Sequence, residues 1–173
     1  MNKSLEELRQ DSSSDKLQQG VAVTSTQDDP ADLTLTLQAK SPQAIVVTGV
    51  TVRRLSAAPV PNTGSVVNME CGGLMSPRVF DVDLMAKEIS LHPVSRGDSK
   101  AVDFPLKVSD SDPEQLSLQL LPGDRDVRFS VEVNWISEGE AHSETVADGV
   151  PVLRVTGPGR LPTYSYAETF AKP

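Results

Sequence analysis

The amino-acid sequence predicts an all-β protein, an antiparallel and immunoglobulin-like β-sandwich that follows a short polar tail. Three observations predict this class. Apolar and polar residues alternate in many short segments, and this two-residue period is typical of half-buried strands. Clusters of glycine, proline, aspartate and serine separate the segments, as turns separate strands. Almost no helical period accompanies them. Short strands at this spacing also fit an open β-barrel, which is the alternative.

The first 20 residues are predicted to be the tail. They hold four apolar side chains among many polar ones, too few to repay the entropy of folding alone. Ser4 and Glu7 fit a helix capping box, so a partly helical tail fits the pattern as well as a flexible one does. We therefore place the β-sandwich domain at residues 21–157 and treat residues 158–173 as a C-terminal extension.

The strands follow one another at short intervals along the domain. The clearest alternation is FSVEVNW at residues 129–135, in which Ser, Glu and Asn separate four apolar residues. Pro105 lies inside another strand pattern and removes a backbone donor, so we expect an edge strand or a bulge there. In chain order the expected strands are residues 21–24, 33–38, 44–52, 66–69, 80–84, 89–91, 104–108, 116–120, 129–135, 144–147 and 150–155.

The alternation also predicts which side chains form the core. Residues of one parity are expected to face inward and those of the other parity to face water. The expected core residues are Phe80, Val82, Leu84, Leu118, Val131, Val133 and Trp135. The expected water-facing residues on the same strands are Asp81, Asp83, Glu132 and Asn134.

The charge balance argues against nucleic acids and anionic membranes as partners. Sixteen basic and 24 acidic side chains give a formal charge of −8, which repels polyphosphates and anionic membranes. Arg53 and Arg54 together, and Lys100, are isolated basic spots in the sequence. Without a basic stripe interleaved with aromatic residues, we expect no binding to nucleic acid.

No catalytic constellation is found in the sequence. Cys71 is the only cysteine, so no intramolecular disulfide can form. A small buried side chain is its expected role, and an accessible thiol beside Gly72-Gly73 is the alternative. The two histidines, His92 and His142, have no second ligand at the short spacing that zinc sites use. There is no Gly-x-Ser-x-Gly elbow and no glycine-rich phosphate loop. We therefore expect a protein that is not an enzyme.

One loop offers a candidate metal site. Asp110, Asp112 and Glu114 place three carboxylates within residues 109–114, and calcium prefers such oxygen ligands. The segment lacks the twelve-residue calcium loop with its glycine and terminal glutamate. Because Asp and Ser are also common turn residues, the sequence favours a plain turn, with calcium as the alternative cofactor.

The C-terminal extension carries three aromatic residues that follow the last expected strand. Tyr164, Tyr166 and Phe170 show no strong period. The sequence favours their packing against the sandwich, because buried aromatic rings stabilise a fold strongly. A partner-binding segment formed by these residues is the alternative.

Several short stretches together resemble an uncharacterised family of actinobacterial β-rich domains, which are often the C-terminal part of membrane-linked proteins. The resemblance runs through most of residues 31–150 and implies a β-sandwich beside a membrane anchor on the outer face of the cell. No activity is established for the family, so no functional residue is carried over. The matching residues are Val47-Thr48-Gly49-Val50 with Val52, Cys71-Gly72-Gly73, Arg78 with Phe80-Asp81-Val82-Asp83-Leu84, Val108-Ser109 with Asp112-Pro113-Glu114, and Glu132-Val133-Asn134-Trp135.

These observations lead to a functional hypothesis by elimination. No apolar run reaches the roughly 18 residues that span a bilayer, and the N-terminus has no apolar signal region, so we expect a soluble chain that does not insert into a membrane. The resemblance favours the extracytoplasmic face of a bacterial membrane, and the cytoplasm is the alternative.

We expect a non-enzymatic interaction or structural module that binds a protein partner or itself, with pairing at an exposed edge strand as one way to do so. The alternative is a calcium-dependent accessory domain that binds carbohydrate or cell-envelope material.

Overall fold

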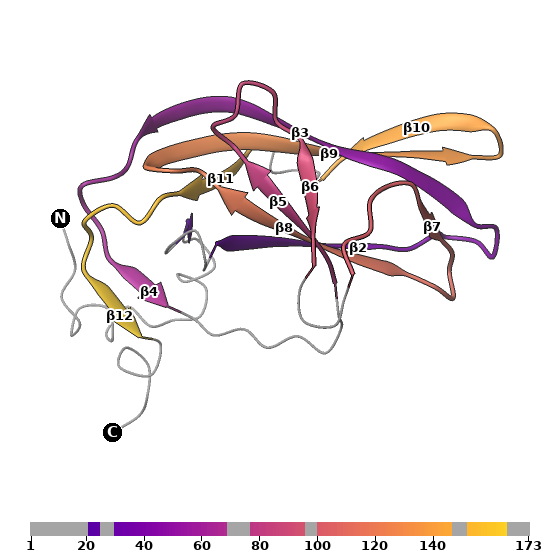
Figure 1. Cartoon of the computed structure of the whole chain (residues 1–173), viewed down its shortest axis with the longest axis horizontal. Helices are drawn as coiled ribbons and strands as arrows, with labels where there is room; N and C mark the ends of the chain where they lie inside the picture. The colour runs from indigo at the N-terminus through magenta and orange to yellow at the C-terminus, as the bar shows by residue number, and fades with distance from the viewer. Residues whose placement is uncertain (1–20, 25–29, 69–76, 96–99, 147–151, 166–173) are drawn as a thin grey trace.

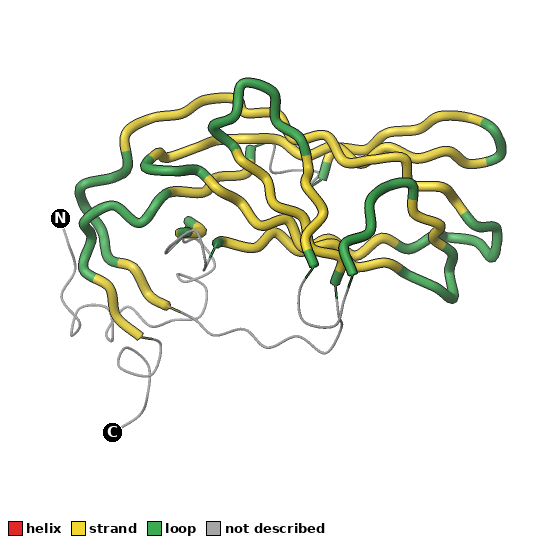
Figure 2. Tube along the Cα trace, viewed as in Figure 1, coloured by secondary structure: helices red, strands yellow, loops and turns green. Residues whose placement is uncertain are grey.

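The computed structural model of the chain describes residues 21–24, 30–68, 77–95, 100–146 and 152–165. These residues form strands and connecting loops and no helix (Figure 2), so the predicted all-β class is confirmed for them. None of the described residues belongs to a helix that could cross a membrane. The strands are β1 (Ala22–Val23), β2 (Ala31–Leu37), β3 (Ile45–Pro59), β4 (Val66–Asn68), β5 (Arg78–Asp83), β6 (Leu91–Val94), β7 (Leu106–Val108), β8 (Glu114–Leu121), β9 (Arg125–Ser137), β10 (Glu140–Thr145), β11 (Leu153–Thr156) and β12 (Thr163–Ser165).

The larger sheet is built on the two longest strands, β3 and β9, which run antiparallel (Figure 1). Its strand order is β1-β11-β9-β3-β7, and β10 pairs with the part of β9 that β11 leaves open. The register of β3 against β9 shifts between Val47 and Gly49 and again between Arg54 and Ser56. Such bulges bend a long strand and increase its twist.

The smaller sheet has four strands in the order β2-β8-β5-β6. Its central pair, β5 and β8, is parallel, as are the short pairs β1–β11 and β4–β12. The expectation of an antiparallel fold was therefore wrong in this respect, since the sheets are mixed. A period of two shows which face of a strand is buried, and it contains no information on the direction of the neighbouring strand.

The two sheets share one hydrophobic core. The predicted core residues Phe80, Val82, Leu84, Leu118, Val131 and Val133 are all buried, and Trp135 is half-buried and packs against this cluster. Of the residues expected to face water, Asp83 is exposed, whereas Asp81, Glu132 and Asn134 are half-buried. The core combines inward residues of both sheets, and its fully buried members are Phe80, Phe129, Leu84, Leu116, Leu118, Val47, Val82, Val108, Val127, Val131 and Val155.

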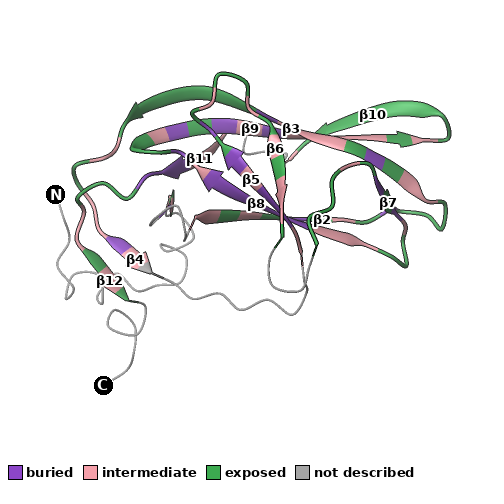
Figure 3. Cartoon of the chain, in the orientation of Figure 1, coloured by how far each residue is buried: buried purple, intermediate pink, exposed green. Residues whose placement is uncertain are grey.

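Strand β8 differs most from its predicted pattern. Residues 116–120 alternate as a half-buried strand would, yet all five are buried, including Ser117 and Gln119 (Figure 3). The strand lies between β2 and β5, and a central strand beside a parallel neighbour is commonly covered on both faces. The buried Ser117 hydroxyl donates a hydrogen bond to Asp32 Oδ1 on β2 at 2.9 Å, which offsets the cost of removing it from water.

The third sheet joins the C-terminal segment to the middle of the chain. β12, which the sequence did not predict, pairs in parallel with β4. The amide of Val66 donates a further hydrogen bond to the carbonyl of Pro162 at 2.9 Å. The beginning of the predicted extension is therefore attached to the rest of the chain by backbone hydrogen bonds.

Candidate functional site

The first candidate site is the outer edge of β2, a lateral strand of the smaller sheet. β8 pairs with one side of β2, and no strand of the described residues pairs with the other side. Asp32, Thr34 and Thr36 are exposed, and Leu33 is half-buried at the border of the core. The strand therefore carries side chains of both kinds along an edge that the described strands leave open.

The hydrogen bonds around β8 show which backbone groups of β2 lie on that edge. The carbonyl of Leu121 accepts a hydrogen bond from the amide of Leu84, which follows β5, so the backbone groups of Leu121 face β5. Successive residues of a strand direct these groups to opposite sides, and those of Leu120 therefore face β2. Leu120 pairs with Ala31, whose amide and carbonyl face β8 in return.

The same alternation continues along β2. Ala31 and the three leucines direct their backbone groups toward β8, whereas Asp32, Thr34 and Thr36 direct theirs toward the outer edge. Three amides and three carbonyls are thus arranged as one side of an antiparallel ladder, with which no strand of the described residues pairs. Such a row can form hydrogen bonds with another extended chain.

The lateral strands β6, β7 and β10 are less suited to this pairing. β6 contains Pro93, which has no amide hydrogen, and β7 has three residues. β10 is exposed along its whole length and carries Glu140 and Glu144 (Figure 3). Prolines, short strands and charges are the means by which proteins protect sheet edges. By contrast, β2 has seven residues, no proline and one charged side chain, Asp32.

The loop that contains the candidate calcium ligands is held by several side-chain hydrogen bonds. Both carboxylate oxygens of Glu114 accept hydrogen bonds from Arg78, at 2.8 and 2.6 Å. These bonds raise the pKa of the Arg78 guanidinium above its usual value. Ser109 Oγ accepts a hydrogen bond from the amide of Asp112, and the carbonyl of Asp110 accepts one from Gln38 Nε2.

These contacts are those of a turn, and calcium at this loop stays a prediction. Asp110 and Asp112 are exposed. Within the described part of the chain, no group of three or more His, Cys, Asp or Glu residues could hold a metal ion.

Among the three predicted C-terminal aromatic residues, the structure describes Tyr164. It is half-buried in β12 and pairs with Val67 of β4. Tyr166 and Phe170 lie outside the described residues, as do Cys71 and the tail at residues 1–20. The choice between a packed segment and a partner-binding segment therefore stays open.

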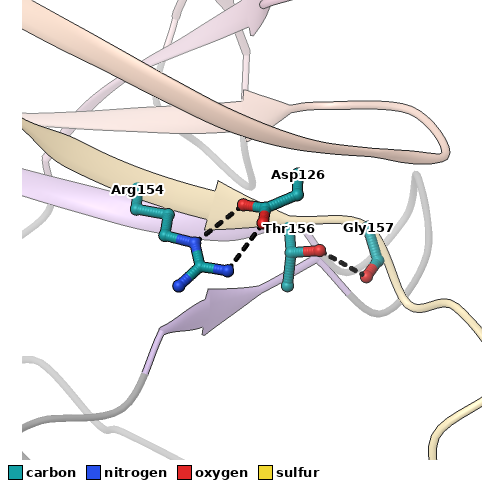
Figure 4. Close-up of polar contacts among 4 residues, drawn as sticks. All are labelled: Asp126, Arg154, Thr156 and Gly157. Carbon is teal, nitrogen blue, oxygen red and sulfur yellow. Dashed lines mark hydrogen bonds and ion pairs between the residues drawn. The ribbon is translucent and has the colours of Figure 1, made fainter. Parts of the chain in front are cut away.

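Three arginines gather on the outer face of the larger sheet, which the sequence did not indicate. Arg154 of β11 lies directly opposite Arg128 of β9, and Arg53 of β3 pairs with Ser130, two residues further along β9. Arg154 forms a bidentate ion pair with Asp126 at 2.8 and 2.6 Å (Figure 4). The isolated basic residue Arg53 is thus part of a cluster, because pairing of strands brings distant residues together.

The ion pair changes the protonation properties of both partners. Hydrogen bonds from Arg154 lower the pKa of the Asp126 carboxyl, and the nearby charges of Arg154 and Arg128 lower it further. The same hydrogen bonds raise the pKa of Arg154. One carboxylate thus neutralises part of the repulsion between arginines that lie opposite each other.

A shallow cleft lies beside β5, β6 and the turn between β8 and β9. It has a volume of about 690 Å³, and its lining includes Asp81, Asp83, Asp124 and His92. Asp83 Oδ1 accepts a hydrogen bond from the amide of Met85, and His92 Nε2 lies 3.1 Å from Ser90 Oγ. The first contact belongs to the turn after β5, and the second joins two neighbouring residues at the start of β6.

No protein-family model matches the chain, and neither a curated protein nor a solved structure matches it significantly.

Proposed function

We propose that this protein is a non-enzymatic interaction module with an immunoglobulin-like β-sandwich, and that the outer edge of β2 receives an extended segment of a protein partner. The observation that supports this proposal is the row of outward backbone groups at Asp32, Thr34 and Thr36. Adding a strand to a sheet edge uses main-chain hydrogen bonds for affinity and alternate side chains for specificity. β2 offers both.

The side chains on the two faces of β2 would contact different side chains of an added strand. A strand added beside β2 would cover the half-buried Leu33 and Leu37, which lie on the core side. Burying apolar surface contributes about 25 cal/mol per Å². Asp32, Thr34 and Thr36 on the other face would select polar neighbours, so an alternating segment with apolar residues on one face is the expected ligand.

The calcium-dependent alternative has less support from the contacts of its loop. Glu114 would have to leave Arg78 before its oxygens could bind a cation, and an unpaired Arg78 would remain beside that cation. The placement of the domain beside a membrane anchor, implied by the resemblance to actinobacterial β-rich domains, is kept as part of the proposal. An edge-binding domain in that position would hold a partner at the cell surface.

The proposal is tested with a displayed library of random peptides selected against the full chain. Thr34→Pro removes one outward amide without removing a hydrogen bond between β2 and β8, because proline is tolerated where the amide faces away from the sheet. Ser143→Pro is the matched control. The amide of Val146 bonds to Val131 of β9, so alternation directs the amide of Ser143 to the outer side of β10.

We expect selected peptides to bind the wild type and Ser143→Pro equally and to bind Thr34→Pro at least tenfold more weakly. Amide hydrogen exchange at Asp32, Thr34 and Thr36 is expected to slow when the peptide is bound. Peptides that bind all three proteins alike, or that leave these amides unprotected, would contradict the proposal.

A further inference from the structure

We infer that a second copy of this chain is a partner of β2, and that the two β2 strands pair antiparallel about a two-fold axis at Thr34. This inference rests on the proposed function of the β2 edge and names the occupant of that edge. It follows from the order of the seven residues ADLTLTL, from the direction of their backbone groups, and from the position of the one charge among them.

The outward backbone groups determine where the axis can lie. In an antiparallel pair, residues whose amides face the partner strand exchange two hydrogen bonds with the residue opposite. An axis at Thr34 places Thr34 opposite Thr34 of the second copy, and Asp32 opposite Thr36 of the second copy. All three residues with outward groups then form such pairs, and none is left without a partner.

The apolar side chains match in the same register. Leu33 lies opposite Leu35 of the second copy, and Ala31 lies opposite Leu37 of the second copy. The strand is thus self-complementary, with leucines on the core face of both copies and threonines on the other. The two four-stranded sheets would continue into one sheet of eight strands, and the half-buried Leu33 and Leu37 would be covered.

The charge and the length of β2 favour the axis at Thr34 over axes at Asp32 or Thr36. An axis at Asp32 would place two aspartates opposite each other, and like charges opposite each other are destabilising. An axis at Thr36 would leave Ala31 to Thr34 without residues of β2 opposite them. The register at Thr34 uses the whole strand and separates the two carboxylates.

The net charge of the chain opposes the pairing of two copies, and β2 limits this repulsion at the interface because it carries one charged side chain. Two copies at −8 each repel one another, and salt screens this repulsion. We therefore expect the dimer to become more stable as ionic strength rises. A dimer built on complementary charges would show the opposite dependence.

The first test measures the mass of the full chain by sedimentation at micromolar to millimolar concentrations. The variants Thr34→Pro and Ser143→Pro are compared with the wild type. We expect a dimer in the wild type and in Ser143→Pro, with a dissociation constant at least tenfold higher in Thr34→Pro. Circular dichroism confirms that each variant is folded.

The second test examines the register by disulfide crosslinking, with Cys71→Ser as the background. Residues opposite each other in a hydrogen-bonded pair have Cα atoms about 5.5 Å apart, which suits a disulfide. Thr34→Cys is expected to form a crosslinked dimer alone. Asp32→Cys and Thr36→Cys are expected to crosslink when mixed and not separately, and Ser143→Cys is the control for random collisions.

The outcomes separate this inference from the proposed function. A wild-type chain that stays monomeric while its selected peptides depend on Thr34 overturns the second copy as partner and leaves the edge function standing. A dimer that Thr34→Pro does not weaken, or a Thr34→Cys variant that crosslinks no faster than Ser143→Cys, also overturns the inference. If neither peptides nor a second copy bind, both proposals fail.

Discussion

The side-chain hydroxyl of Thr24 donates a hydrogen bond of 2.8 Å to the backbone carbonyl of Leu120, 96 positions further along the chain. The same oxygen accepts a hydrogen bond from the amide of Ala31 at 3.2 Å, while the amide of Thr24 bonds to the carbonyl of Thr156. Thr24 is buried. One residue therefore links the larger sheet, through its backbone amide, to β2 and β8 of the smaller sheet, through its side chain.

Replacing Thr24 by valine is expected to destabilise the protein by about 1–3 kcal/mol. Valine keeps the shape of threonine but leaves the Leu120 carbonyl and the Ala31 amide without this partner, and such groups are costly when buried. Urea denaturation gives the free energy of unfolding. Thr24→Ser retains the hydroxyl and is the control. Equal stability of the valine and serine variants would show that the hydroxyl does not link the sheets.

Arg54 provides a second link between the sheets. Its Nη1 donates hydrogen bonds to the carbonyls of Leu84 at 2.6 Å and Ala86 at 3.2 Å, beyond the end of β5. Arg54→Ala is expected to lower the free energy of unfolding by about 1 kcal/mol, because charged hydrogen bonds are lost. Arg53→Ala, on the opposite face of β3, is expected to change it by less than about 0.5 kcal/mol. A larger effect at Arg53 than at Arg54 would contradict this difference.

Gly157 is required by the close approach of the chain after β11 to the turn between β8 and β9. A Cβ atom at Gly157 would lie 2.1 Å from the carbonyl oxygen of Gly123, so the backbone would have to move. Gly157→Ala is expected to destabilise the protein by about 2 kcal/mol or more. Gly49→Ala is the matched control, since its Cβ would meet nothing within 4 Å. Similar melting temperatures for the two variants would contradict this assignment.

Acidification is expected to remove the stabilising contribution of Asp126. Because Arg154 lowers the pKa of this carboxyl in the folded protein, folding favours the ionised form. The contribution is present above the unfolded pKa of about 4 and is lost as the pH falls through the lower folded pKa. Asp126→Asn should therefore lose less stability than the wild type in that window.

The titration of Asp126 is measured directly through the carboxyl ¹³C shift. Its midpoint is expected to lie below the usual value for aspartate in the wild type and to return toward that value in Arg154→Ala. A midpoint that does not respond to the loss of Arg154 would show that the ion pair is absent in solution.

Calcium is expected to leave the melting temperature unchanged. Glu114 is engaged by Arg78 through both oxygens, so the loop offers no preformed ligand set. The measurement is a thermal melt at about 1 mM calcium, with EDTA added afterwards, because a ligand that binds the folded state raises its stability. A reversible rise of several degrees would establish the calcium site instead.

The sequence predicted where the strands lie better than it predicted which strands pair with one another. The alternation at residues 80–84 and 129–135 located parts of β5 and β9 and their core residues, because burial of one face imposes a period of two. β3 continues to Pro59 beyond its predicted end. Its last residues are exposed, and no apolar alternation there indicated a strand.

The sequence predicted the outer edge of β2 only in part. Residues 33–38 predicted a strand, but nothing in them showed that this strand would lie at the edge of its sheet. Residues 116–120 have the same alternation and form a central strand. Burial of Ser117 and Gln119 on the second face of β8 depends on which strands flank it. The arginine cluster depends on strand pairing in the same way.

The sequence by itself determined the all-β class, the position of most strands and the parity of the core residues, because these depend on local alternation and turn residues. Only the tertiary structure decided that β5 and β8 are parallel, that β8 is covered on both faces, and that the backbone groups of Asp32, Thr34 and Thr36 lie on an edge. These features depend on contacts between residues far apart in the chain, as between Thr24 and Leu120, and a local pattern does not contain them.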